Sequence, residues 1–162
     1  SAFAPKRFVF WDQSPEMIAI AKSRFADANA EFVTASLLDL HCREEFNVIT
    51  AIQVNHYLPP EERRKAVANA YQALQPGGIF FTFENFAPNS RAGQQLALKR
   101  WGAYQVAQGR SAQQVKGHLA RYDKDYFPIS LSAHLQLLQD CGFQTAELLW
   151  LSYLQVGLFG IK

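Results

Sequence analysis

The run Phe46–Val54 (FNVITAIQV) constrains the fold of this chain more than any other segment. It is mostly apolar after its first residues, whereas a strand with one face in water alternates apolar and polar side chains. A strand of this composition needs cover on both faces, which is typical of a parallel sheet flanked by helices. The run therefore predicts an α/β protein.

Strand and helix patterns alternate on both sides of this run. Shorter aromatic or β-branched runs predict further strands at Arg7–Trp11, Glu31–Ala35 and Ile79–Phe83. A helix is predicted to begin at Ser14-Pro15-Glu16, where a capping side chain, a proline and an acid follow one another. This alternation favours a mostly parallel sheet.

The clearest helix is predicted to open at Pro59–Glu62, where prolines and acids suit a first turn. Its predicted apolar stripe is Val67, Ala70, Tyr71 and Leu74, and its predicted solvated side is Arg63, Arg64 and Lys65. Pro76-Gly77-Gly78 is predicted to stop the helix before the next strand.

The second half of the chain is predicted to be more irregular. Residues 87–125 form a polar helical insertion or lid, with a helix over Arg91–Gln108 that ends at Gly109. A short helix is expected at Leu131–Asp140, followed by extended segments at Thr145–Leu151 and Tyr153–Ile161. With 162 residues, the chain is expected to form a single domain over residues 1–162.

Composition excludes several classes of protein. A formal net charge of +2 is too small to favour a nucleic-acid clamp or a protein of the membrane surface. The two cysteines, Cys42 and Cys141, cannot build a disulfide framework and suit a reducing cytoplasm. No metal site, signal peptide or apolar run of about 20 residues is visible, so neither a metal nor a membrane is expected.

Polar residues follow the predicted strands, and ligands of open α/β sheets bind beyond these carboxyl ends. Asp12 is either a ligand for ribose hydroxyls or a cap for its turn. His56 is either a base or a structural hydrogen-bonding residue, and Glu84 is either a site residue or a solvated strand end. No glycine-rich loop follows the first visible strand, so a usual phosphate cradle is not expected.

Three segments resemble class I S-adenosylmethionine-dependent methyltransferases. Phe8–Met17 (FVFWDQSPEM) resembles their second strand and the turn after it. Pro59–Glu84, with its Leu-x-Pro-Gly-Gly turn, resembles their fourth helix and fifth strand, and Cys141–Phe143 with Leu149–Lys162 resembles their final strands. The resemblance implies a Rossmann-like, mostly parallel sheet with flanking helices that ends in an antiparallel strand pair. It also implies S-adenosylmethionine as cofactor.

The same resemblance assigns roles by position. It implies that Asp12 holds the cofactor ribose and that Ser36 stands where the family commonly has an aspartate that contacts adenine. His56 would face the substrate, with Glu84 as a second candidate for catalysis. Leu137 stands where one branch has an arginine that reads a carboxylate, which favours ordinary S-adenosylmethionine. The remaining cofactor candidates are Gln13, Met17, Leu37, Gln53 and Asn55, and the substrate candidates are Trp101, Tyr104, Arg121, Tyr122 and Tyr153.

The resemblance departs from the family at its start, because the usual first strand and glycine-rich loop are lacking. Three explanations stay open: the chain is truncated, its two flanking strands pair directly, or a second copy supplies the pairing in a homodimer. The predicted function is methyl transfer from S-adenosylmethionine to a small-molecule or RNA acceptor. The alternative is a truncated, catalytically silent domain that acts as a binding or oligomerisation module.

Overall fold

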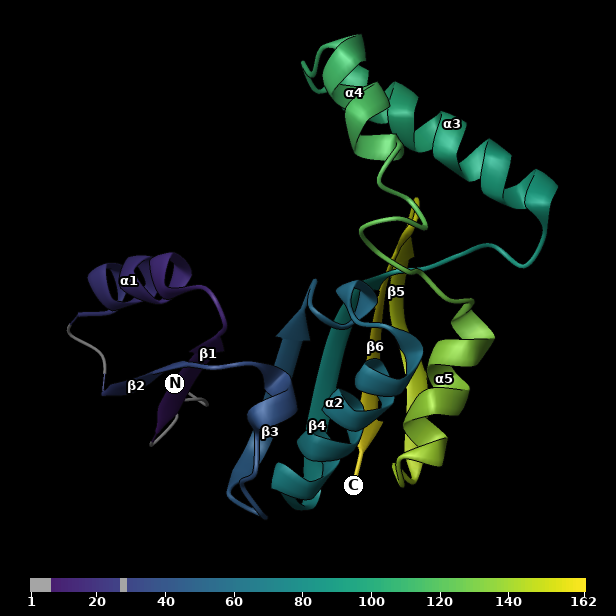
Figure 1. Ribbon diagram of the computed structural model, residues 1–162. Helices are drawn as coiled ribbons and strands as arrows, with labels where there is room; N and C mark the ends of the chain where they lie inside the picture. Colours follow the sequence, from purple (N-terminus) through teal and green to yellow (C-terminus); the bar gives the residue numbers. More distant parts are fainter. Residues whose placement is uncertain (1–6, 27–28) are drawn as a thin grey trace. The chain divides into compact units, whose positions relative to one another are not determined.

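The computed structural model describes residues 7–26 and 29–162 (Figure 1). The chain divides into two compact units, residues 1–41 and 42–162, and each is described by itself. The single domain expected from the sequence stays a prediction. None of the described helices is long and apolar enough to cross a membrane.

The first unit is a small β-α-β arrangement. Strand β1 (Phe8–Asp12) pairs in parallel with β2 (Ala30–Thr34), and helix α1 (Pro15–Arg24) connects them. A short 3-10 helix, η1 (Leu37–Asp39), follows β2. The ring of Phe10 stacks on Phe32 across the two strands, with 5.3 Å between ring centroids. The strands and the helix start predicted from the sequence are therefore present.

The second unit contains a four-stranded sheet in the order β3-β4-β6-β5, within the part of the chain described. Strand β3 pairs in parallel with β4, while β6 runs antiparallel to both β4 and β5. The prediction of a mostly parallel α/β fold that ends in an antiparallel strand pair is confirmed. The strands are β3 (Phe46–Ile52), β4 (Leu74–Asn85), β5 (Thr145–Ser152) and β6 (Gln155–Ile161).

Two helices cover one face of this sheet, as Figure 1 shows: α2 (Pro60–Ala73) and α5 (Leu131–Asp140). Their apolar stripes meet the inward side chains of β4 and β6. Burial of such side chains, at about 1.5–3 kcal/mol each, is the main force that holds the layers together. Buried residues of this core include Val67, Phe80, Leu138, Phe143 and Leu158.

Helix α2 differs from the prediction at one position. The stripe residues Val67, Ala70 and Leu74 are buried as predicted, but Arg63, predicted to be solvated, is only 2% exposed. The prediction for Arg63 was wrong because the charge run Arg63–Lys65 hid its helical spacing: Arg63 lies one turn before Val67, on the same helix face.

The segment between β4 and α5 forms a helical hairpin. Helix α3 (Arg91–Ala107) begins at the capping side chain of Ser90, and α4 (Ala112–Leu119) begins at Ser111. Gly109 lies between them with a φ of +90°, a conformation that glycine adopts without steric cost. The sequence pattern predicts α3 closely but does not separate α4 from the rest of the insertion.

Candidate functional site

In the first unit, polar side chains lie at the carboxyl ends of both strands. Asp12 ends β1, and its Oδ1 accepts a hydrogen bond from the amide of Ser14 at 2.8 Å, which shapes the turn into α1. Ser36 follows β2, and its hydroxyl accepts from the amide of Leu38 at 3.2 Å to cap η1. Both alternatives for Asp12 stay open, because its Oδ2 has no partner among the described residues.

The other cofactor candidates of this unit lie beside these ends. Gln13 is exposed in the turn after β1, and Met17 is 52% exposed on the first turn of α1. Leu37 is half-buried at the start of η1. The unit therefore presents its predicted adenosine-binding residues at one end of a parallel strand pair, where ligands of α/β sheets bind.

In the second unit, the chain turns sharply where β3 ends. Gln53 has a φ of +57°, and its amide donates to the carbonyl of Phe83 on β4 at 2.8 Å. A non-glycine residue in the left-handed region carries strain that the surrounding contacts must offset. Asn55 and His56 follow in the 3-10 helix η2 (Asn55–Tyr57), and both are buried.

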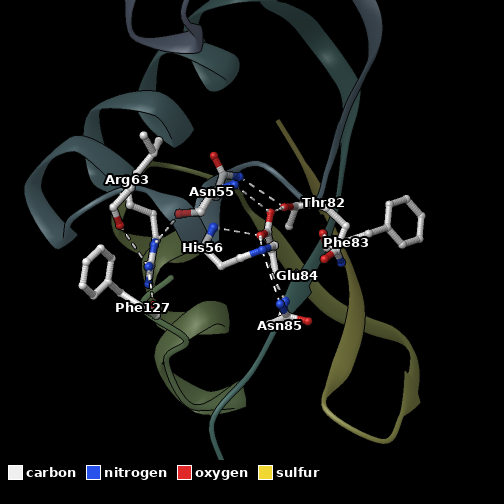
Figure 2. Close-up of polar contacts among 10 residues, drawn as sticks. Asn55, His56, Arg63, Thr82, Phe83, Glu84, Asn85 and Phe127 are labelled. Atoms are coloured by element: carbon white, nitrogen blue, oxygen red, sulfur yellow. Dashed lines mark hydrogen bonds and ion pairs between the residues drawn. The ribbon is translucent and has the colours of Figure 1, made fainter. Parts of the chain in front are cut away.

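Figure 2 shows the buried polar contacts that fix this turn, with the carboxylate of Glu84 at their centre. Glu84 lies near the end of β4 and accepts from the amides of Asn55 at 3.3 Å and His56 at 3.0 Å. Its Oε2 also lies 2.7 Å from Nδ1 of His56, and its Oε1 accepts from the hydroxyl of Thr82. Several donors around two oxygens match an ionised carboxylate, which can only accept.

The contacts of the His56 ring assign its tautomer. Because Nδ1 lies 2.7 Å from Glu84 Oε2, this nitrogen carries the proton and donates it to the carboxylate. The other nitrogen, Nε2, then accepts from the side-chain amide of Asn85 at 3.3 Å. The structure brings the two predicted catalytic residues together, but His56 and Glu84 are both 0% exposed.

Arg63 of α2 ties the same turn to a distant segment of the chain. Its guanidinium donates to the carbonyls of Asn55 at 2.9 Å, Leu58 at 3.1 Å and Phe127. The amide of Phe127 in turn donates to the carbonyl of His56 at 2.7 Å. Burial lowers the pKa of Arg63, and the charge of Glu84 opposes this shift. One buried carbonyl and two partly buried carbonyls thus depend on one side chain.

A second histidine, His134 on α5, faces this cluster, and the sequence analysis misses it. Burial lowers its pKa to about 4; the charge of Glu84 opposes this shift, whereas the charge of Arg63 adds to it. Its Nε2 and the Oδ1 atoms of Asn55 and Asn85 are buried without a hydrogen-bond partner among the described residues. Helical spacing could have predicted that His134 is buried, because it lies one turn before the core residue Leu138 on the same helix face.

The predicted substrate residues fall into separate groups. Tyr104 and Tyr153 lie together, with 4.7 Å between their ring centroids. Trp101 packs edge-on against His118 at 4.7 Å, and Arg121 pairs with Asp125 at 2.8 Å. Tyr122 packs edge-on against Tyr126, and burial raises its pKa to about 12. Their contact with a substrate stays a prediction.

No group of three or more potential metal ligands occurs in residues 7–26 and 29–162. The candidate functional residues are the polar residues at the strand ends, described for each unit by itself.

Comparisons with known proteins find similarity to a methyltransferase domain and to carboxy-S-adenosyl-L-methionine synthases. A family model described as a methyltransferase domain matches residues 1–78. The carboxy-S-adenosyl-L-methionine synthase of Helicobacter hepaticus is 26% identical over 151 residues, which span 91% of this chain and 63% of that relative. The chain thus covers less than two thirds of this relative.

Solved structures support the same fold. A structure of a putative methyltransferase from Bacillus halodurans matches with a TM-score of 0.63 and 18% identity, over 88% of this chain and 56% of that one. Human N-acetylserotonin methyltransferase in complex with S-adenosylmethionine matches with a TM-score of 0.67 and 15% identity, over 96% and 40% of the two chains. The resemblance found in the sequence is therefore confirmed: this chain is similar to the class I S-adenosylmethionine-dependent methyltransferases.

Proposed function

We propose that this chain is the part of a methyltransferase that binds S-adenosylmethionine and positions it for methyl transfer to an acceptor. The observation that carries the proposal is the placement of polar residues at the carboxyl ends of parallel strands in both units. S-adenosylmethionine supplies an activated methyl group on its sulfonium, so the protein contributes binding, orientation and exclusion of water.

The first unit is proposed to bind the adenosine end. Asp12 Oδ1 is engaged with Ser14, and Oδ2 is left to accept from a ribose hydroxyl. Gln13 and Met17 are exposed beside it and would contact the nucleoside, while Ser36 and Leu37 would contact the adenine ring. Because the Ser36 hydroxyl already caps η1, we expect it to contribute little affinity of its own.

The second unit is proposed to bind the methionine end through the turn after β3. Gln53 is half-buried in this turn, and Asn55 carries an acceptor oxygen that has no partner in the described structure. A cationic amino group is a suitable donor for such an oxygen. His56 and Glu84 hold this turn in place, and the proton transfer predicted for them stays a prediction because neither side chain is exposed.

The acceptor is proposed to be a small molecule or an RNA, with Tyr104 and Tyr153 as its first candidate contacts. Because relatives are named carboxy-S-adenosyl-L-methionine synthase, a reaction that modifies the cofactor itself is the second candidate function. The residue Leu137, predicted to replace an arginine that reads a carboxylate, packs against the core. A leucine provides α5 with no cation at that position, which favours the unmodified cofactor.

Calorimetric titration with S-adenosylhomocysteine, the product of methyl transfer, tests the proposal. We expect micromolar binding that is weakened by Asp12→Ala and is unchanged by Asp140→Ala, a control at an exposed acid of α5. Absence of binding to the folded chain would reject the proposal for this chain and favour the silent-module alternative. Tighter binding of the carboxylated cofactor would favour the second candidate function.

A further inference from the structure

The α3–α4 hairpin differs in charge from the rest of the molecule. Residues 86–122 contain six lysines and arginines and no aspartate or glutamate. The rest of the chain holds ten basic and fourteen acidic residues, so the small net charge of +2 conceals a basic segment on an acidic protein. All six cations are exposed: Arg91, Lys99, Arg100, Arg110, Lys116 and Arg121.

An open groove of about 320 Å³ runs between the two helices of this hairpin. Leu98 and Val106 of α3 and Val115 and Leu119 of α4 line it, so its surface is apolar. The helices approach closely at Gly102, where an added Cβ would lie 3.2 Å from Leu119 Cδ1. In Figure 1 the hairpin lies beyond the end of the sheet, away from α2 and α5, so neither helix of the core covers it.

Lysines from both helices also line the groove. Lys99 of α3 and Lys116 of α4 are exposed and have no carboxylate within ion-pair distance in the described part of the chain. By contrast, Arg110 and Arg121 are engaged with Gln105 and Asp125. The groove therefore combines an apolar lining with two available cations.

From this combination we propose that the groove binds an acidic amphipathic helix of a partner protein. Apolar side chains of such a helix would fill the groove, as a third helix packed on a helical pair, and its carboxylates would meet Lys99 and Lys116. A nucleic acid would satisfy the cations but leave the apolar lining without a partner. A second copy of this chain is disfavoured, because no described helix carries more than two carboxylates.

Fluorescence anisotropy with a synthetic labelled helix tests this proposal. The probe has about 15 residues, enough for a marginally stable helix, with leucines at every third and fourth position and glutamates between them. We expect saturable binding that weakens as salt is added, because the carboxylate–lysine pairs are exposed. Replacement of the leucines by serines, or of the glutamates by lysines, is expected to abolish it.

Two protein variants with equal charge change separate the groove from general electrostatics. K99E/K116E is expected to weaken binding by about tenfold or more. The matched variant R43E/K65E reverses two exposed cations outside the hairpin and is expected to change binding less than about twofold. Far-ultraviolet circular dichroism should show the same helix content for all three proteins.

Four outcomes would overturn the proposal. The first is no saturable binding of the probe at millimolar concentration, and the second is an equal loss in both variants. The third is tight binding of a labelled polyuridylate that K99E/K116E removes while the acidic helix does not bind. The fourth is self-association in gel filtration that K99E/K116E abolishes, since the groove would then be an interface between copies.

Discussion

The two units place similar polar residues at their strand ends but hold them in different ways. In the first unit, the side chains of Asp12 and Ser36 accept hydrogen bonds from backbone amides of their own turns, two residues along the chain. In the second unit, Glu84 contacts Asn55 and His56 from another strand end, and Arg63 joins their turn to Phe127, which lies 64 residues after Arg63. Local turns leave side chains accessible to a ligand, whereas in the buried network the side chains of Glu84 and Arg63 position the backbone.

The largest effect on stability is expected at Glu84, because its buried carboxylate accepts hydrogen bonds from several buried donors. Glu84→Ala leaves buried donors of Asn55, His56 and Thr82 without an acceptor and is expected to destabilise the protein by about 4 kcal/mol. Thermal unfolding would show a fall in Tm of about 10 °C for a chain of this size.

Glu147→Ala provides the control for this prediction. Glu147 is an exposed glutamate on β5, and its loss is expected to change stability by less than about 0.5 kcal/mol. Equal effects of the two substitutions would show that the Glu84 network is no more structural than a surface acid.

The adjacent arginines Arg63 and Arg64 offer a matched pair for the next prediction. Arg63→Met removes the donor to one buried and two partly buried carbonyls and is expected to cost about 3 kcal/mol. Arg64→Met breaks only an exposed pair with Asp140 and is expected to cost less than about 1 kcal/mol. Urea unfolding of both variants measures the difference, and a ratio near one would remove Arg63 from the positioning network.

Parts of the fold and of the candidate site can be predicted from the sequence, and others cannot. Periodicity predicts α5 and the stripe of α2, because apolar spacing directly reflects the face that packs on the sheet. Strand ends predict that His56 and Glu84 lie at one edge, and the structure brings them together. The charge run itself gives no sign that Arg63 points inward, because one of its three carbonyl partners, Phe127, lies 64 residues away in the sequence.

His134 provides a test of the buried network by pH. Its pKa is about 4 in the folded chain against 6.5 without the protein environment, so the unfolded chain binds the proton first as pH falls. Stability is therefore expected to decrease from pH 6.5 to pH 4, by on the order of 2–3 kcal/mol in total.

Unfolding titrations across this pH range measure the effect of His134. His134→Leu is expected to flatten the decrease, whereas His41→Gln, at an exposed histidine, is expected to leave it in place. A wild-type stability that is flat between pH 6.5 and pH 4 would contradict the burial of a neutral His134.

The smallest effect on stability is expected at Asp12. A substitution there tests whether the strand-end residues of the first unit bind a ligand rather than hold the fold. Asp12→Asn keeps an oxygen that can accept from the Ser14 amide, so stability is expected to change by less than about 0.5 kcal/mol. Affinity for S-adenosylhomocysteine is nevertheless expected to fall by about tenfold, because a neutral amide oxygen accepts more weakly from a ribose hydroxyl.

Calorimetry and unfolding of the same Asp12→Asn preparation separate these two effects, with Asp140→Asn as the control. Unchanged affinity would remove the ribose assignment. A loss of more than about 2 kcal/mol in stability would instead show that Asp12 is as structural as Glu84, because local turn contacts seldom contribute that much. The polar side chains at the strand ends of the first unit would then be structural, like those of the second unit, rather than accessible to a ligand.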